Sequence, residues 1–275
     1  MPTPKLGILA SDEKAFHAAR ESDPVELVVL RSTLVNPPRA AGARSVAENI
    51  QKLHRYASLV PYVWHLVTHG PEDHLRELAS RALPGHPRHF GHLQNTPEVQ
   101  DAWQTSLRCA QAFGAKYMLL RTPASFTPST ANHARLAAFA EARAAEGELV
   151  WEAEGLWEPA QTLSVARKLG MQTVIPAFDG AGRPFKGSLE RRWLRVDGAG
   201  PTTKLRGILA ESLVHAMTTA DVGAPVLFAG PRAYANMRAF AIELAITEEE
   251  DDDDLDDDDE EEDGDEDEAD DAEDK

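Results

Sequence analysis

Charged residues stand at the ends of two apolar runs in this sequence. The run ELVWEAE carries Glu152 and Glu154, and the run RRWLRVDG carries Arg195 and Asp197. Side chains two positions apart lie on the same face of a β-strand, so each pair would project together if both runs are strands. Carboxylates beside arginines can perform acid–base chemistry or hold a divalent cation. The same groups can also form a salt-bridge network that performs no chemistry.

Three further apolar runs end in polar residues. VELVVLRST ends at Ser32 and Thr33, YVWHLVTH ends at Thr68 and His69, and KYMLLRTP contains Arg121 and Thr122. If YVWHLVTH is a strand, His65 and His69 share one of its faces. Among all these residues, Glu152 is the candidate base or metal ligand and His69 the candidate acid or ligand. Arg195 is suited to hold an anion.

Apolar runs alternate with helical patterns along the chain. The runs cover residues 5–10, 25–33, 62–69, 116–123, 148–154, 171–178, 191–198 and 224–230. Helical patterns are found at residues 12–22, 45–58, 98–113, 130–146, 159–170, 205–219 and 231–245, with no clear helix between the sixth and seventh runs. Eight buried strands that alternate with helices predict an α/β protein, a single (β/α)8 TIM-like barrel.

A barrel gives the polar residues a common location. In such barrels the catalytic and binding groups lie at the carboxyl ends of the strands, and the opposite rim contributes stability. All the polar run ends named above would meet at the carboxyl end, which we call the mouth. The sequence therefore predicts one site at the mouth, for a small-molecule or anionic ligand.

The acidic residues are concentrated at the end of the chain. Residues 248 to 275 contain 23 Asp or Glu residues and one Lys. The whole chain has a formal net charge of −18, which leaves residues 1 to 247 near +4. A segment with so many like charges cannot bury enough apolar surface to fold. We expect a barrel domain of residues 1–247 and a disordered acidic tail of residues 248–275, which either keeps the protein soluble or meets a basic protein partner.

Composition also excludes several classes. The single cysteine, Cys109, excludes a disulfide framework and a cysteine-rich zinc site. No apolar stretch approaches the roughly 20 residues of a membrane span. The opening MPTPKLGILASDEK lacks a signal pattern, so we expect a cytoplasmic protein with no membrane partner. A weakly basic barrel beside a polyacidic tail lacks the basic face that direct nucleic-acid binding requires.

Four segments resemble a known family. RTPASF is similar to a Gln-Thr-Pro-Pro-Ser-Phe run, and WEAEGLW is similar to Trp-Glu-Pro-Arg-Gly followed by Trp. Both runs are typical of domain-of-unknown-function family 72, also called YecE-like. VELVVLRST and VTH are similar to two further family segments. The resemblance covers nearly the whole barrel and implies a TIM-barrel fold, but it implies no activity, because none is established for the family and fold alone does not define function.

The sequence departs from the family pattern at the predicted mouth. Arg121 stands where members have Gln, Glu154 where they have Arg, and Asp197 where they have His. These exchanges reverse the sign of local charge. Because an unpaired buried charge is very costly, we expect Arg121 and Glu154 to form an ion pair between neighbouring strands. The chain is thus expected to be a divergent relative that keeps the scaffold and changes its mouth.

These comparisons define the predicted site. Glu152 and His69 are the catalytic candidates, and the ligand-binding candidates are Arg121, Glu154, Trp157, Arg195 and Asp197. We assign no metal site and no cofactor. His86, His89 and His92 recur every third residue and could converge on zinc, but the intervening prolines and Gly91 interrupt any helix, which favours a solvated loop.

Two functions remain. The first is a binding or scaffold protein with an acidic interaction tail, which the mouth substitutions favour. The second is a hydrolase-like enzyme that acts on a phosphorylated or nucleic-acid-related substrate through Glu152 and His69.

Overall fold

The structure is a computed structural model of the chain. It describes residues 3–11, 13–81, 84–197, 204–205, 207–219 and 223–256. For residues 13–14 and 248–256 it describes the backbone alone. All statements below concern these residues.

Eight strands form one parallel sheet that is nearly closed. They are β1 (Leu6–Ala10), β2 (Leu27–Leu30), β3 (Ser58–Pro61), β4 (Tyr117–Thr122), β5 (Glu148–Ala153), β6 (Gln172–Pro176), β7 (Arg192–Val196) and β8 (Val226–Phe228). Their order is β3-β2-β1-β8-β7-β6-β5-β4, and every neighbouring pair is parallel. A bridge between Tyr62 and Leu119 joins the two outer strands, and the Val63 amide donates to the Leu119 carbonyl over 2.8 Å. The predicted barrel is confirmed.

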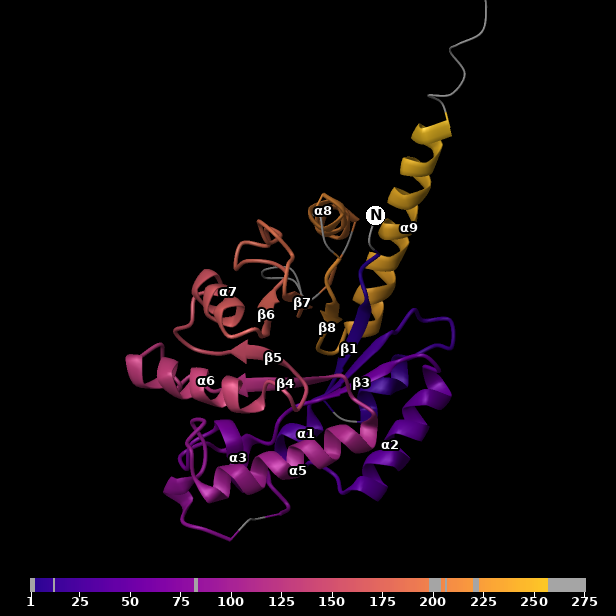
Figure 1. Ribbon diagram of the computed structural model, residues 1–275. Coiled ribbons are helices and arrows are strands. Elements are labelled where there is room, and N and C mark those ends of the chain that lie inside the picture. Colours follow the sequence, from indigo (N-terminus) through magenta and orange to yellow (C-terminus); the bar gives the residue numbers. More distant parts are fainter. Residues whose placement is uncertain are drawn as a thin grey trace, which may run out of the picture.

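Helices surround the sheet on its outer side (Figure 1). The longer ones are α2 (Ala40–Leu53), α5 (Pro97–Phe113), α6 (Thr130–Arg143), α7 (Pro159–Lys168), α8 (Gly207–Thr218) and α9 (Ala233–Asp256). Short turns lie between them: η1 (Glu13–Ala18), α1 (Ser32–Val35), α3 (His65–Thr68), α4 (Leu75–Leu78) and η2 (Pro87–His89). The connection between β6 and β7 contains no helix, as predicted. None of the helices described in the chain has the length and apolar character needed to cross a membrane.

Helix α5 positions the turn that follows β3. The Thr96 side chain accepts the Val99 amide over 3.3 Å at its start, and Gly114 ends it with φ 65°, a conformation that glycine adopts without strain. The buried face of α5 includes Ser106, whose hydroxyl accepts the amide of Trp64 over 3.0 Å. The backbone that enters α3 is therefore fixed by a helix more than thirty residues further along the chain.

The structure corrects the sequence prediction at two strands. Strand β3 ends at Pro61, so half of the run predicted as a strand at residues 62–69 forms the helical turn α3, with His69 at its end. Strand β2 ends at Leu30, and Ser32 and Thr33 lie in α1. Both segments are apolar and buried, and periodicity over so few residues does not separate a buried helical turn from a buried strand. His65 and His69 are therefore separated by one helical turn and do not share a strand face.

The last helix carries the chain away from the mouth. Helix α9 begins beside the carboxyl end of β8 and extends past the rim at which β1 begins (Figure 1). It continues to Asp256, and so its backbone is helical in the first part of the segment for which the sequence predicted disorder. Residues 257–275 lie outside the described residues.

Candidate functional site at the barrel mouth

A polar layer closes the barrel interior at its mouth. The middle of the interior is apolar and includes Leu9, Val29, Val60, Leu119, Val150, Val174, Trp193 and Leu227. Two positions after Val60, Leu119, Val150 and Trp193, toward the carboxyl ends of the strands, the chain has Tyr62, Arg121, Glu152 and Arg195, respectively. Because strand side chains alternate, these polar residues point to the same inner side as the apolar ones below them.

Glu152 is at the centre of this layer. Its side chain is only 5% exposed, and one carboxylate oxygen, Oε2, accepts the Tyr62 hydroxyl over 2.7 Å. The other oxygen, Oε1, accepts a guanidinium N–H of Arg195. Burial, and then the neighbouring carboxylate of Glu152, raise the pKa of Tyr62 well above its ordinary value, so the phenol keeps its proton and donates a hydrogen bond to Glu152.

The arginines of the layer are also paired. Arg121 Nε donates to Glu154 Oε1 over 2.9 Å and its Nη2 contacts the same oxygen, so the predicted ion pair is confirmed. Arg195 Nε donates to Asp197 Oδ2 over 2.7 Å. Burial alone would lower the pKa of Arg121, but the carboxylates of Glu152 and Glu154 raise it above its ordinary value. The mouth is therefore a network of opposite charges in which each arginine faces at least one carboxylate.

Tyr62 is the member of the network that the sequence did not reveal. It lies at the start of a run taken as a strand, and its aromatic ring fits an ordinary core position. The structure fixes its backbone through Thr33, whose hydroxyl accepts the Tyr62 amide over 2.7 Å and lies 2.7 Å from the Leu30 carbonyl. The only signal in the sequence is its place at the carboxyl end of a strand, which becomes informative once the strand boundary is known.

His69 does not form the predicted catalytic pair with Glu152. It is buried, and its Nδ1 is 2.7 Å from the Thr68 hydroxyl. Burial lowers its pKa to about 3. The imidazole is therefore neutral at pH 7 and is not in the protonated form that a general acid needs. No hydrogen bond among the described residues joins His69 to Glu152. The structure thus brings five of the candidates together and leaves His69 beside them.

Trp157 occupies the hydrophobic core. Its indole Nε1 donates to the Phe126 carbonyl over 2.5 Å, and its ring meets that of Trp151 edge to face with centroids 4.8 Å apart. The ring is buried, which suits packing behind the mouth better than direct contact with a ligand.

The loop histidines face different partners. His89 Nδ1 lies 2.7 Å from Glu98 Oε1, and His92 Nε2 lies 3.2 Å from the Ser125 hydroxyl. His86 accepts the amide of Arg88. Within the described ranges, no three His, Cys, Asp or Glu side chains are grouped so that they could hold a metal ion.

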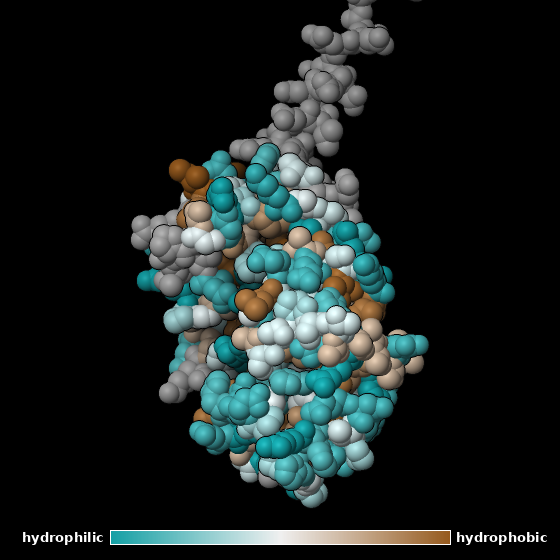
Figure 2. Space-filling model, turned by 90° about the vertical axis from the view of Figure 1, so that its left-hand side faces the viewer, coloured by the Kyte–Doolittle hydropathy of each residue, from teal (hydrophilic) through white to brown (hydrophobic). Residues whose placement is uncertain are grey.

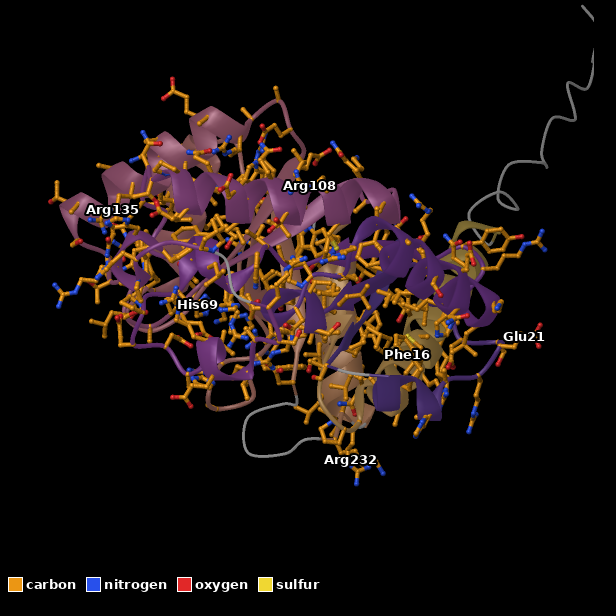
Figure 3. The ribbon with its side chains drawn as sticks, turned by 90° about the horizontal axis from the view of Figure 1, so that it is seen from below. Phe16, Glu21, His69, Arg108, Arg135 and Arg232 are labelled. Carbon is orange, nitrogen blue, oxygen red and sulfur yellow. The ribbon has the colours of Figure 1, made fainter. Side chains whose placement is uncertain are left out.

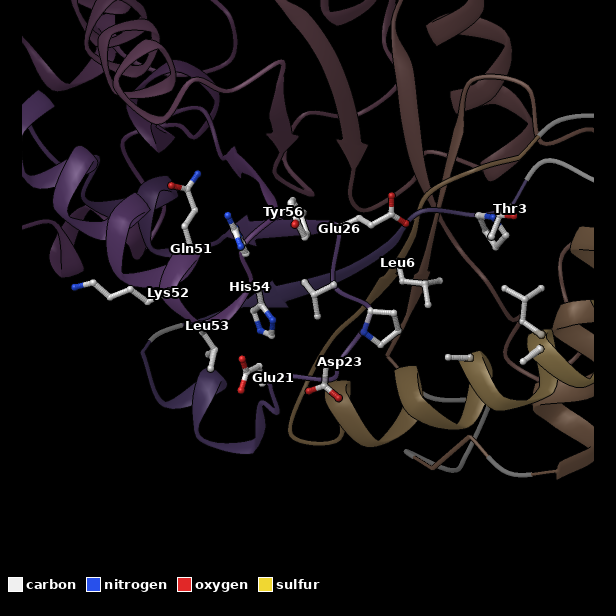
Figure 4. A pocket seen from close by; sticks show the side chains of 17 residues that line it. Thr3, Leu6, Glu21, Asp23, Glu26, Gln51, Lys52, Leu53, His54 and Tyr56 are labelled. Carbon is white, nitrogen blue, oxygen red and sulfur yellow. The ribbon is translucent and has the colours of Figure 1, made fainter.

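A large cavity lies at the other end of the barrel. It measures about 900 Å³ and is lined by residues at the amino ends of the strands, including Leu6, Asp23 and His54 (Figure 4). Asp23 accepts from Arg238 Nε over 2.6 Å, and His54 Nε2 lies 2.9 Å from the Tyr234 hydroxyl. These contacts tie α9 to the barrel, which is the stabilising role that this rim has in such folds. Volume alone therefore does not identify the site.

The mouth itself presents a polar surface. Figure 2 views the molecule from the side toward which β4 and β5 point in Figure 1, and hydrophilic and intermediate residues cover most of that face. Each oxygen of Glu152 already accepts from one donor, Tyr62 or Arg195, so a substrate proton would have to share an oxygen with that donor or displace it. The geometry as it stands is that of a closed electrostatic network.

Comparison with known proteins supports the fold. No family model matches the sequence, and a search of curated proteins finds no match. A DUF72 family protein from Enterococcus faecalis V583 is similar in structure, with a TM-score of 0.58, 11% sequence identity, and coverage of 88% of this chain and 96% of the other. A D-tagatose 3-epimerase-like protein has a TM-score of 0.51 at 11% identity and covers 90% of this chain and 99% of its own. The chain therefore has the TIM-barrel-like fold of a DUF72 protein, the family that its sequence motifs resemble.

Proposed function

We propose that this chain is a binding or scaffold protein, in which the barrel is a stable carrier and the acidic C-terminal segment meets a basic protein partner. The observation that carries the proposal is the state of Glu152, the best candidate for a catalytic base. Its two oxygens are taken by Tyr62 and Arg195. A base that already holds two hydrogen-bond donors is poorly placed to accept a proton from a substrate.

The distribution of charge supports the second half of the proposal. Residues 248 to 275 hold 23 acidic residues, and α9 carries this segment out at the rim away from the mouth. A dense negative charge attracts basic surfaces over several ångströms and accelerates their encounter. The network at the mouth is compensated and does not compete for the same partner.

The enzyme remains the alternative because of one observation. Glu152 is a buried carboxylate at the carboxyl end of a barrel strand, which is where barrel enzymes hold their catalytic groups. A substrate that displaced Arg195 toward Asp197 would free one carboxylate oxygen. Under this alternative the chain is a hydrolase-like enzyme for a phosphorylated or nucleic-acid-related substrate.

A thermal-shift screen separates the two functions. Divalent cations, phosphorylated sugars and nucleotides are added to the wild type and to Glu152→Gln, and melting temperatures are compared. The proposal expects no compound that stabilises the wild type and fails to stabilise the variant. A compound with that behaviour would favour the enzyme, since its binding would depend on the Glu152 carboxylate.

A second measurement addresses the acidic segment. A lysine-rich peptide is titrated into the full chain and into a chain that ends at residue 247, at low and high salt. The full chain should bind, and its affinity should fall steeply with salt because the attraction is electrostatic. Equal affinity of the two chains would remove the role proposed for the segment.

A further inference from the structure

A second cavity lies beside the mouth, outside the barrel. It measures about 310 Å³ and is lined by His65, Leu66, Arg76, Ala79, Arg81, Gly85, Pro87 and Phe90. Its polar side chains are therefore two arginines and a histidine, with no carboxylate among the lining residues. A cavity with this lining differs from the mouth, where every arginine faces a carboxylate.

Both arginines of this cavity are held by aromatic rings. The Arg76 guanidinium lies over the ring of Phe90 at 5.1 Å, and the Arg81 guanidinium lies over the ring of Trp64 at 4.8 Å. Neither arginine forms an ion pair within the described part of the chain. Stacking orients a guanidinium without neutralising it, so two positive charges remain available.

Two buried polar atoms of side chains that line this cavity have no hydrogen-bond partner among the residues that the structure describes. These are Nη2 of Arg81 and Nε2 of His65, and His65 is fully buried. Leaving such atoms without a hydrogen bond is costly. A ligand that bonded to both would recover that cost.

The tautomer of His65 defines what the ligand must supply. His65 Nδ1 lies 3.0 Å from the Leu34 carbonyl, and a carbonyl only accepts, so Nδ1 carries the proton and neutral Nε2 is an acceptor. The ligand thus needs oxygens that accept from the arginines and one hydroxyl that donates to His65. A phosphate group that retains one proton has both.

We propose that this cavity binds the phosphate group of a small ligand in its singly protonated form. The arginines offset the negative charge of the phosphate. His65 Nε2 accepts a hydrogen bond from the one phosphate hydroxyl. The charged or titratable groups that act on His65 are Arg76, Asp73, which precedes α4, and His69, which ends α3. Burial lowers the pKa of His65 and Arg76 lowers it further, while Asp73 opposes them, so the ring stays neutral and Nε2 remains an acceptor.

The prediction can be tested by calorimetry on the full chain. Inorganic phosphate and glycerol 3-phosphate are titrated at constant ionic strength at about pH 5 and about pH 8, on either side of the second phosphate pKa of about 6. Saturable binding should be tighter at the lower pH. Binding of both probes points to a phosphate ester, and binding of inorganic phosphate alone points to the free ion.

Three variants connect binding to the cavity. Arg81→Met keeps the contact with Trp64 and removes the charge, and Arg76→Met does the same over Phe90; each should weaken binding about tenfold or more. Arg232→Met is the matched control, because Arg232 is exposed, is not among the residues that line the cavity, and lies at the lower edge of the molecule in Figure 3. Its affinity should equal that of the wild type.

Three results would overturn the proposal. They are the absence of saturable binding to the wild type, unchanged binding in both cavity variants, and an equal loss in Arg232→Met. The last would mean that phosphate responds to overall charge and has no site. Binding here does not depend on Glu152, so the outcome is independent of the function proposed for the mouth.

Discussion

Replacing Glu152 by glutamine tests whether the mouth network holds the barrel together. Glutamine has the same shape and can still hydrogen-bond to Tyr62 and Arg195, so the substitution removes charge and leaves packing intact. A charge-assisted hydrogen bond contributes about 1.5–3 kcal/mol and a neutral one about 0.5–1.5 kcal/mol. Arg195 is 29% exposed and retains Asp197, so it is not left unpaired. We expect a loss of about 2 kcal/mol in the free energy of unfolding.

Urea unfolding followed by tryptophan fluorescence measures this loss. Trp151 and Trp193 are buried in the strands that carry Glu152 and Arg195, so their emission reports on this part of the barrel. Glu148→Gln is the matched control, since Glu148 begins the same strand and pairs with Lys116 on the surface at 3.2 Å, with 49% of its side chain exposed. It should cost about 0.5 kcal/mol or less.

The comparison of the two variants decides the argument. Equal losses for Glu152→Gln and Glu148→Gln would mean that the buried network contributes no more than a surface pair. A gain in stability for Glu152→Gln would mean that desolvation of the carboxylate outweighs its bonds, as happens for some buried pairs. Either result would refute the view that the mouth is closed by favourable electrostatics.

Three other predictions concern the remaining features. A double-mutant cycle of Arg121→Met and Glu154→Gln in urea should give a coupling energy of about 1 kcal/mol, and a value near zero would contradict a direct pair. Burial lowers the pKa of His69 from 6.5 to about 3. Between these two pH values the unfolded chain binds more protons than the folded chain, so the free energy of unfolding decreases as the pH decreases. His69→Asn should therefore lose less stability than the wild type between about pH 7 and pH 5; an equal loss would contradict the assignment. Deleting residues 257–275 should change the free energy of unfolding by no more than about 0.5 kcal/mol, because a segment so rich in like charges makes few stabilising contacts, and a larger change in urea would show that it packs on the barrel.

The barrel and one ion pair could be predicted from the sequence because each leaves a local signal. Eight apolar runs separated by helical patterns specify the strands. Arg121 and Glu154 were found because two charges of opposite sign replace family residues on adjacent strands. A compensating exchange is visible in one sequence once the family pattern is known.

The rest depends on the closed barrel. Tyr62 reaches Glu152 only because barrel closure places the end of β3 beside β4, which itself pairs with β5, a relation that sequence spacing does not contain. The cavity of His65 was hidden for a related reason. His65 was assigned to a strand, and only the helical turn α3 brings it to Arg76 and Arg81.

The path of helix α9 separates the start of the acidic segment from the mouth. Helix α9 starts near the mouth at Ala233, so residue 248, where the acidic segment begins, lies about 22 Å further along its axis at 1.5 Å per residue. Charges in water are screened over about 8 Å at physiological ionic strength. The acidic segment therefore leaves the barrel more than two screening lengths from the mouth. The arginines of the mouth are already paired with carboxylates. A basic partner bound to the acidic segment would thus leave the mouth open.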